Sequence, residues 1–359
     1  MIRIRQAGFW ASFVDAGRKH AQSRGYSQSG ALDALSFNYA NALLGQSLNR
    51  AAIEVTAGHF ACEFNAPCFI VVTGADAELS INGKAFDINT VIYVKSGQYL
   101  KIVALRSGLI NYIGIKAKLR FSLDNDLSGN ISDHLFAGSV CAVAREKTGG
   151  IHKDGSALRE KDLIDFTSDH VADACLNAEQ LSDIALSITK TSAVRLSPML
   201  LDLLNAGGKS EKKIPFSLAY QANLFSAQQL TQFFNSRYTI SKHIDRMGMR
   251  LQGKALVCDT QTLASQGITF GAVQVAGDGQ PIIMRNDRQT IGGYPIIGSV
   301  SKLGMAILGQ ATSGQEIVFM QTDFETSRQK SILVQIELQN LSTLCARLFK
   351  TPSRSRSTE

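Results

Sequence analysis

The feature that most constrains this chain is a series of short β-branched and aromatic segments separated by turn residues. Residues 69–73 and 99–105 have this composition in the first half, and Asn82-Gly83 between them is a dipeptide typical of tight hairpins. Residues 272–275 and 281–284 repeat the pattern in the second half. Short strands at this spacing predict barrels or sandwiches in two β-rich halves, and not one array of alternating strands and helices.

Helical patterns are few. Apolar residues recur at helical spacing in 29–44 and in 336–348, and Ser226 with Gln229 forms a capping box ahead of a third helix. We therefore predict an all-β fold class, mainly β with a few helices. The predicted domains are an N-terminal domain at 1–205, a C-terminal domain at 206–325, and a helix with a disordered tail at 326–359.

Composition excludes several classes of function. The formal net charge of the 359 residues is +7, and the Lys and Arg residues are scattered, so we expect no nucleic-acid partner. No apolar run approaches the ~18 residues of a membrane helix, so we expect no membrane partner. The six cysteines form no CxxC pair and the six histidines form no HxxxH pair, so we expect no metal site. Without a signal peptide, these features predict a cytoplasmic protein with reduced thiols.

A first group of polar residues surrounds glycines in the N-terminal third of the chain. A helix that begins near Ser29 would offer free N–H groups to an anion. The alternative is capping and turn chemistry, with Glu54 paired to Arg18. The candidate substrate-binding residues of this group are Asp15, Arg18, Asp33, Asn41 and Glu54.

A second, denser group lies near the end of the C-terminal half. Arg288 carries a planar guanidinium that suits a carboxylate or a phosphate, and neighbouring polar side chains would fix an amide or hydroxyl. The alternative is a structural network of ion pairs, Asp245 with Arg250 and Asp287 with Arg246. The candidates of this group are Asp245, Arg246, Gln274, Gln280, Asp287, Arg288, Gln289, Thr290 and Tyr294.

The motifs around these residues carry a specific resemblance. They read F-V-D-A-G-R at 13–18, S-G-A-L-D at 29–33, D-R-M-G-M-R-L at 245–251 and D-R-Q-T-I-G-G-Y-P at 287–295. Together they resemble the carboxyltransferase-domain family, which includes the C-type subunit of 5-oxoprolinase, allophanate hydrolase subunit 2 and biotin-dependent carboxyltransferases. The resemblance implies two cyclophilin-like β-barrel domains.

The resemblance also implies a function. A 5-oxoprolinase opens 5-oxo-L-proline to L-glutamate with ATP and Mg, and this chain would be its C-type subunit, working with subunits of types A and B. The catalytic residues would be Asp245, Arg246, Asp287 and Arg288. Arg288 would hold a carboxylate or a phosphoryl group, and an Asp would orient an Arg or act as base. Gln274, Gln289 and Thr290 would hydrogen-bond the lactam.

Two alternatives stay open. The first is a biotin-dependent carboxyltransferase that acts on urea or a related amide. No Lys here lies between two methionines, so biotin is not expected on this chain and a partner would carry it. The second is a non-catalytic regulatory partner of a kinase inhibitor protein that resembles the B-type subunit. Gly138–Ala142 favours it, because this stretch lacks the two terminal hydroxyls of the family pattern G-S-x-S-T.

Overall fold

The computed structural model describes most of the chain. The described residues are 2–18, 20, 22–120, 144–145, 162–168, 178–206, 211–258 and 263–350. Gly138–Ala142 and the predicted disordered tail lie outside these ranges.

The chain forms two compact units, and neither is one continuous segment. The first unit contains Met1–Ala16, Leu35–Leu201 and Ile336–Glu359, and the second contains Gly17–Ala34 and Asp202–Gln335. The boundaries that we predict at residues 205 and 325 stay predictions. The short segment 17–34 therefore packs with residues that lie far from it in sequence.

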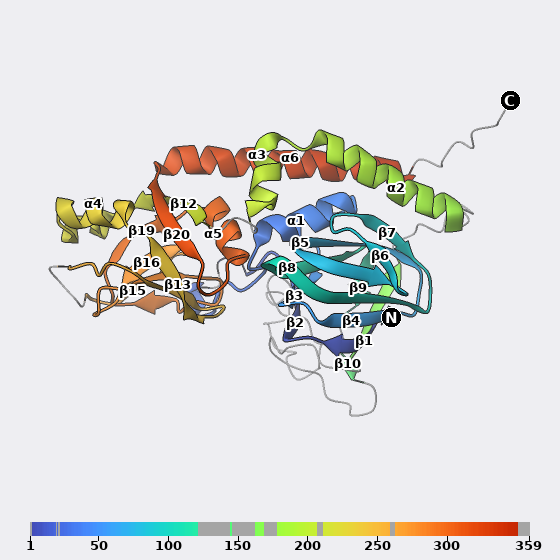
Figure 1. The fold of residues 1–359 in the computed structure, drawn as a ribbon, viewed down its shortest axis with the longest axis horizontal. Coiled ribbons are helices and arrows are strands. Elements are labelled where there is room, and N and C mark those ends of the chain that lie inside the picture. Colours follow the sequence, from blue (N-terminus) through green and yellow to red (C-terminus); the bar gives the residue numbers. More distant parts are fainter. Residues whose placement is uncertain are drawn as a thin grey trace. The chain divides into compact units, whose positions relative to one another are not determined.

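The first unit contains an 11-stranded sheet, of which β5 and β8 are the longest strands (Figure 1). Its main order is β10-β11-β1-β4-β8-β3-β2, and β5 pairs with β6, β7 and β8. The strands are β1 (Ile2–Ala7), β2 (Trp10–Val14), β3 (Ala52–Thr56), β4 (Phe60–Phe64), β5 (Cys68–Ile81), β6 (Lys84–Phe86), β7 (Val91–Val94), β8 (Gln98–Ile115), β9 (Ala117–Arg120), β10 (Ala144–Arg145) and β11 (Asp162–Ser168).

This sheet corrects the expectation, implied by the resemblance, of two β-barrel domains. It curls into a half-barrel, because β2 and β10 end the order and do not pair with each other among the described strands. The predicted hairpin is confirmed: Asn82 and Gly83 have φ of 48° and 81° and join β5 to β6. Positive φ at both residues is what a tight two-residue turn between twisted strands requires.

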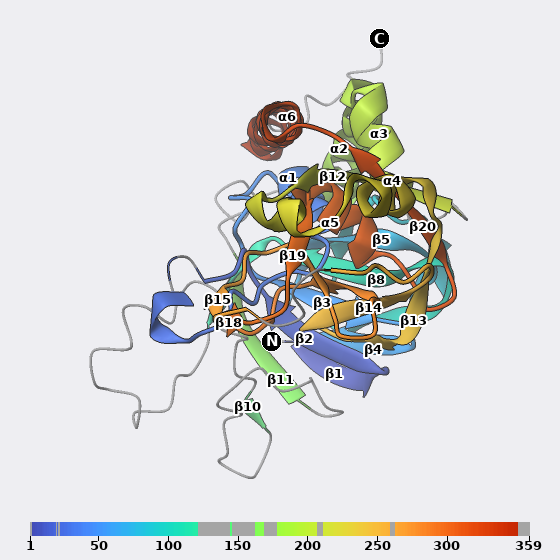
Figure 2. The same ribbon diagram turned by 90° about the vertical axis from the view of Figure 1, so that its left-hand side faces the viewer.

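The second unit contains the closed barrel that the sequence predicted. Its seven strands follow the order β12-β19-β16-β17-β14-β13-β20, and β12 pairs with β20 in parallel to close it. They are β12 (Glu211–Leu218), β13 (Tyr238–Ile244), β14 (Gly248–Gln252), β16 (Ala272–Val275), β17 (Pro281–Met284), β19 (Ile296–Val300) and β20 (Glu316–Gln321). Figure 2 labels β12, β13, β14, β19 and β20 of this barrel. A separate ribbon pairs β15 (Gln266–Gly267) with β18 (Ile291–Gly292). Likeness to cyclophilin stays a prediction.

Helices are more numerous than the sequence indicated, so the fold is mixed α/β and mainly β. The predicted helix at 29–44 begins only at Ala34, and the helix after Ser226 is confirmed, with the Ser226 hydroxyl accepting from the Gln229 N–H at 3.3 Å. The α-helices are α1 (Ala34–Leu43), α2 (Ala178–Arg195), α3 (Pro198–Leu204), α4 (Ala227–Asn235), α5 (Lys302–Gly309) and α6 (Phe324–Lys350); short 3-10 turns are η1 (Gln22–Arg24) and η4 (Tyr220–Leu224). We did not predict α2, α3 or α5.

Aromatic side chains fill the closed barrel. Phe233 of α4 stacks on Phe319 of β20 with ring centroids 4.5 Å apart, and Phe216 of β12 packs on both. All three are buried. Truncation of such a ring removes its buried area and leaves a cavity that the rigid barrel cannot close.

We expect Phe233→Ala to lower the free energy of unfolding by about 3–5 kcal/mol. The matched control is Phe324→Ala, since that ring is 73% exposed, and we expect it to change stability by less than about 0.5 kcal/mol. Urea denaturation of the full chain, followed by far-UV circular dichroism, measures both. Equal midpoints for the two variants would contradict this account of the core.

Candidate functional site

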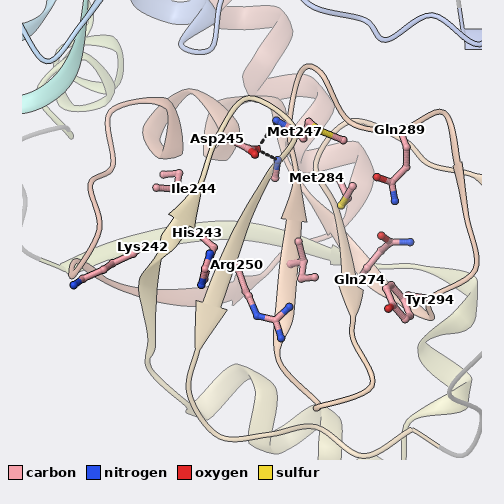
Figure 3. A pocket seen from close by; sticks show the side chains of 12 residues that line it. Lys242, His243, Ile244, Asp245, Met247, Arg250, Gln274, Met284, Gln289 and Tyr294 are labelled. Carbon is pink, nitrogen blue, oxygen red and sulfur yellow. Dashed lines mark hydrogen bonds between the residues drawn. The ribbon is translucent and has the colours of Figure 1, made fainter. Parts of the chain in front are cut away.

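A pocket of about 520 Å³ lies on the outer face of the second-unit barrel (Figure 3). Arg250, Ile282 and Gln274 are register partners on β14, β17 and β16, so they form one row across three strands. Their neighbours in sequence face the barrel core, and side chains alternate along a strand, so this row faces outward. The pocket is lined by Lys242, His243, Ile244, Asp245, Met247, Gly248, Arg250, Gln274, Ile282, Met284, Gln289 and Tyr294.

One side of the pocket is cationic. Lys242 and His243 are exposed near the end of β13, where the pairing with β14 is irregular. Arg250 lies beside them on β14 and forms an ion pair with Asp278. Burial alone would raise the pKa of Asp278, but hydrogen bonds from the Gln280 N–H and the Arg250 guanidinium outweigh it and lower that pKa. This side of the pocket therefore offers hydrogen-bond donors to an anion, with Arg250 sharing its charge with Asp278.

Asp245 lines the pocket and also forms the turn between β13 and β14. Its Oδ1 accepts from the N–H groups of Met247 at 2.7 Å and Gly248 at 2.9 Å. This is the side-chain-to-backbone bonding by which Asp stabilises a tight turn. The predicted pair of Asp245 with Arg250 is wrong, because Arg250 pairs with Asp278.

The opposite side of the pocket carries neutral polar groups. Gln274 is only 1% exposed, and its Nε2 has no hydrogen-bond partner among the described residues. Gln289 and Tyr294 are exposed and line the pocket with it. Figure 3 shows Gln274 between Gln289 and Tyr294. Gln274, Gln289, Tyr294 and Asp245 are the predicted site residues that the structure brings together.

Arg288, a predicted catalytic residue, does not line this pocket. It is 2% exposed, and its Nε and Nη1 donate to the carbonyl oxygens of Ile268 at 3.0 Å and Arg285 at 3.1 Å. The guanidinium also lies over the Phe270 ring, 5.7 Å from its centroid. Burial lowers the pKa of Arg288. In this geometry Arg288 ties together the backbone on either side of the ribbon β15–β18.

Arg246 and Asp287 belong to a clamp on segment 17–34. Arg246 Nε donates to Asp287 Oδ2 at 2.6 Å, which is the ion pair of our structural alternative, and Arg246 Nη2 donates to the Gly30 carbonyl at 2.7 Å. Asn286 Nδ2 donates to the carbonyls of Ser29 at 3.1 Å and Ala31 at 2.9 Å. Three consecutive carbonyl oxygens of the segment are thus held by two side chains of the second unit.

Within the second unit, Arg18 and Asp33 are the predicted binding residues of the first group. Arg18 donates to the Ser27 carbonyl at 3.3 Å, and the buried Asp33 accepts from Gln310 Nε2 at 2.8 Å. Neither lines the pocket. The first contact lies within segment 17–34, and the second ties the segment to Gln310 at the end of α5.

In the first unit, Asn41 and Glu54 are buried, and Asp15 is half-buried. Asn41 Nδ2 donates to the carbonyls of Leu48 at 3.1 Å and Arg50 at 2.8 Å, and Glu54 accepts from the Tyr112 hydroxyl at 2.8 Å. These hydrogen bonds satisfy buried backbone and side-chain polar groups inside the unit. For Asn41 this agrees with the alternative of capping and turn chemistry.

Gln280 and Thr290 also lie outside the pocket lining. Gln280 accepts from the Gly253 N–H at 2.9 Å and donates to its carbonyl at 3.2 Å, so it joins two loops. The Thr290 carbonyl accepts from the Ile268 N–H at 3.0 Å beside the ribbon.

Sequence reasoning missed the cationic side of the pocket. Lys242 and His243 belong to no motif that the sequence analysis used, and Arg250 was considered only as an ion-pair partner of Asp245. Strand alternation after the turn at Asp245 would have placed Arg250 on the face opposite Met249, outside the core. Across the described ranges, no group of three or more His, Cys, Asp or Glu is placed to hold a metal ion. No helix in those ranges is long and apolar enough to cross a membrane.

Comparison with known proteins identifies the family. Residues 24–321 match the carboxyltransferase domain, subdomain A and B. The chain belongs to this family. It is 30% identical to the C-type subunit of 5-oxoprolinase from Haemophilus influenzae, over 89% of this chain and 90% of that protein, and 28% identical to that of Escherichia coli, over 90% and 92%.

Solved structures of the family share the fold. Urea amidolyase of K. lactis superposes with a TM-score of 0.75 at 21% identity, covering 95% of this chain and 20% of that chain. This chain therefore spans about a fifth of that longer protein. The likeness supports the half-barrel and closed barrel described above.

We expect Arg250→Gln to raise the pKa of Asp278 toward its ordinary value of ~3.9. The pKa of Asp278 is lower in the folded chain than in the unfolded chain. The ion pair therefore stabilises the fold at pH values above the pKa that Asp278 has in the unfolded chain, and this stabilisation is lost as the pH falls through its pKa in the folded chain. Carboxyl ¹³C chemical shifts of the full chain, followed through an acid titration, measure this. Arg237→Gln is the control, because Arg237 pairs with Glu211 instead. An unchanged pKa in Arg250→Gln would contradict the pairing.

Proposed function

We propose that this chain is the C-type subunit of an ATP-dependent 5-oxoprolinase and that it works in a complex with subunits of types A and B. The observation that carries this proposal is the extent of the match: the alignment with the corresponding 5-oxoprolinase subunit of Escherichia coli covers 90% of this chain and 92% of that protein. The similarity thus extends over most of both sequences.

The pocket has the chemistry that 5-oxoproline requires. That substrate carries an anionic carboxylate and a neutral lactam. Arg250 and Lys242 supply positive charge on one side of the pocket, and the Gln274 amide supplies hydrogen bonding on the other. We assign the carboxylate to Arg250, since a guanidinium can bind a carboxylate through two parallel hydrogen bonds. This assignment replaces the one that the sequence suggested for Arg288.

The reaction needs activation of an unreactive bond. A lactam is stabilised by amide resonance, and transfer of a phosphoryl group to its oxygen makes the carbon electrophilic. ATP would supply that group in the complex. The donors Lys242, His243 and Arg250 suit a phosphoryl oxygen as well as a carboxylate. Mg would accompany ATP and bind largely through its phosphates, and we assign it to no residue of this chain.

The second candidate is a biotin-dependent carboxyltransferase that acts on urea. The shared fold with urea amidolyase, at a TM-score of 0.75, favours it. A partner would carry biotin in this case. The two candidates differ in their co-substrates, so an assay of the complex with each set of substrates separates them.

We expect the reconstituted complex to form glutamate from 5-oxo-L-proline and ATP. Arg250→Ala should lower kcat/KM by on the order of 10²-fold, because it removes a charge-assisted contact with the substrate. Arg237→Ala removes the same charge from an exposed pair on the same unit and should leave kcat/KM unchanged.

Two results would overturn the proposal. Carboxylation of urea by carboxybiotin, without glutamate formation from 5-oxoproline, would select the carboxyltransferase. Copurification of the subunits with neither activity would select the non-catalytic regulatory partner. Wild-type rates in Arg250→Ala would remove Arg250 from the site and leave the family assignment untouched.

A further inference from the structure

We propose that Gln274 and Gln289 form a subsite for one amide carbonyl oxygen and that Gly292 determines its specificity, because a side chain at this position would fill it. This inference deepens the proposed function. The statement that the bound amide is a lactam rests on that proposed function. The subsite itself is argued from the contacts of the pocket alone.

The first observation is the unsatisfied amide of Gln274. Its side chain is buried, lines the pocket, and has no hydrogen-bond partner at Nε2 in the described part of the chain. A buried donor without a partner is destabilising, because its desolvation is not offset by a hydrogen bond, and a ligand that accepts from it removes that cost. β16 holds Gln274 between register partners on both sides, Ile282 and Ile296, which fixes the face of the sheet from which its side chain leaves.

The second observation is the space beside Gly292. A Cβ built on Gly292 would lie 3.2 Å from Gln274 Nε2 and 3.5 Å from Gln289 Nε2. Two amide nitrogens from different segments therefore converge on the same small space. The same Cβ would overlap Ile268 Cδ1 at 2.7 Å, so Gly292 has room for no added atom unless Ile268 shifts.

The ribbon fixes Gly292 in place. β18 pairs Gly292 with Gln266 of β15, and the neighbouring Gly293 carbonyl accepts from the Leu263 N–H at 2.9 Å. The backbone is thus tied on this side, and a side chain added at Gly292 would displace the amides or the ligand.

The chemistry of the donors selects the ligand. Two neutral N–H donors suit the two lone pairs of a carbonyl oxygen. The positive charge lies at the other end of the row, on Arg250, two strand spacings or roughly 10 Å away between Cα atoms. The pocket therefore orients a small molecule that has an anionic group at one end and an amide carbonyl at the other.

The test uses the full chain and direct binding. We expect millimolar urea and 5-oxo-L-proline to shift the side-chain amide resonances of Gln274 and Gln289 in ¹⁵N-labelled protein. Gly292→Ala should weaken this binding by at least about 10-fold, because the added methyl group displaces the amides or the ligand. Gln274→Leu should weaken it to a similar degree, because it removes a hydrogen bond in a buried site. Gly267→Ala is the matched control on the partner strand of the ribbon, since its Cβ would meet nothing within 4 Å.

Further probes separate the ends of the pocket. Acetate should bind through Arg250 and keep its affinity in Gly292→Ala. Methylammonium, which can only donate hydrogen bonds, should leave both amides unshifted, and a shift of Gln274 by methylammonium would overturn the assignment of acceptors.

The outcomes distinguish this inference from the proposed function. Gln274-dependent binding of urea, with none of 5-oxoproline, would keep the subsite and remove the 5-oxoprolinase proposal. Binding of 5-oxoproline that is unchanged in both Gly292→Ala and Gln274→Leu would remove the subsite and keep the enzyme. Amide resonances that no carbonyl probe moves would also overturn the subsite, and this measurement on the unaltered chain stands even if a variant fails to fold.

Discussion

The alternation of side chains across the wall of the closed barrel is the constraint on which the site depends. Phe216, Phe233 and Phe319 occupy the interior, so β14, β16 and β17 must turn their other face outward. That face carries Arg250 and Gln274 in one row. A shift of one residue in this register would place both polar side chains in the aromatic core, so packing inside the barrel fixes the chemistry outside it.

The most specific motif of the sequence divides its residues between two tasks. Arg288 and Asp287 of D-R-Q-T-I-G-G-Y-P hold backbone in place, while Gln289 and Tyr294 of the same run line the pocket. The Arg288 guanidinium donates to backbone carbonyl oxygens, so its role is to hold loops together. A guanidinium that bound substrate would serve recognition instead. A motif is therefore evidence for a site, and the hydrogen bonds decide which of its members face the ligand.

Local features of the fold could be predicted from the sequence. The hairpin at Asn82-Gly83 and the cap at Ser226 were found because the signal and the structure lie within a few residues of each other. The open edge of the first sheet and the position of Arg250 could not be found in this way, because each depends on pairing between distant strands. Of the site, the amide side was predicted from its motif, and the cationic side was missed.

The clamp on segment 17–34 has a consequence for how the protein is made. The segment leaves the ribosome early, but its seat is formed by Arg246 and Asn286, which are synthesised more than two hundred residues later. The first unit likewise includes Ile336–Glu359 from the very end of the chain. Neither unit can therefore be completed until residues from late in the sequence have been synthesised. A chain divided at its midpoint gives two halves that each lack a segment of their unit. To express the second unit separately, residues 17–34 would have to be included together with residues 202–335.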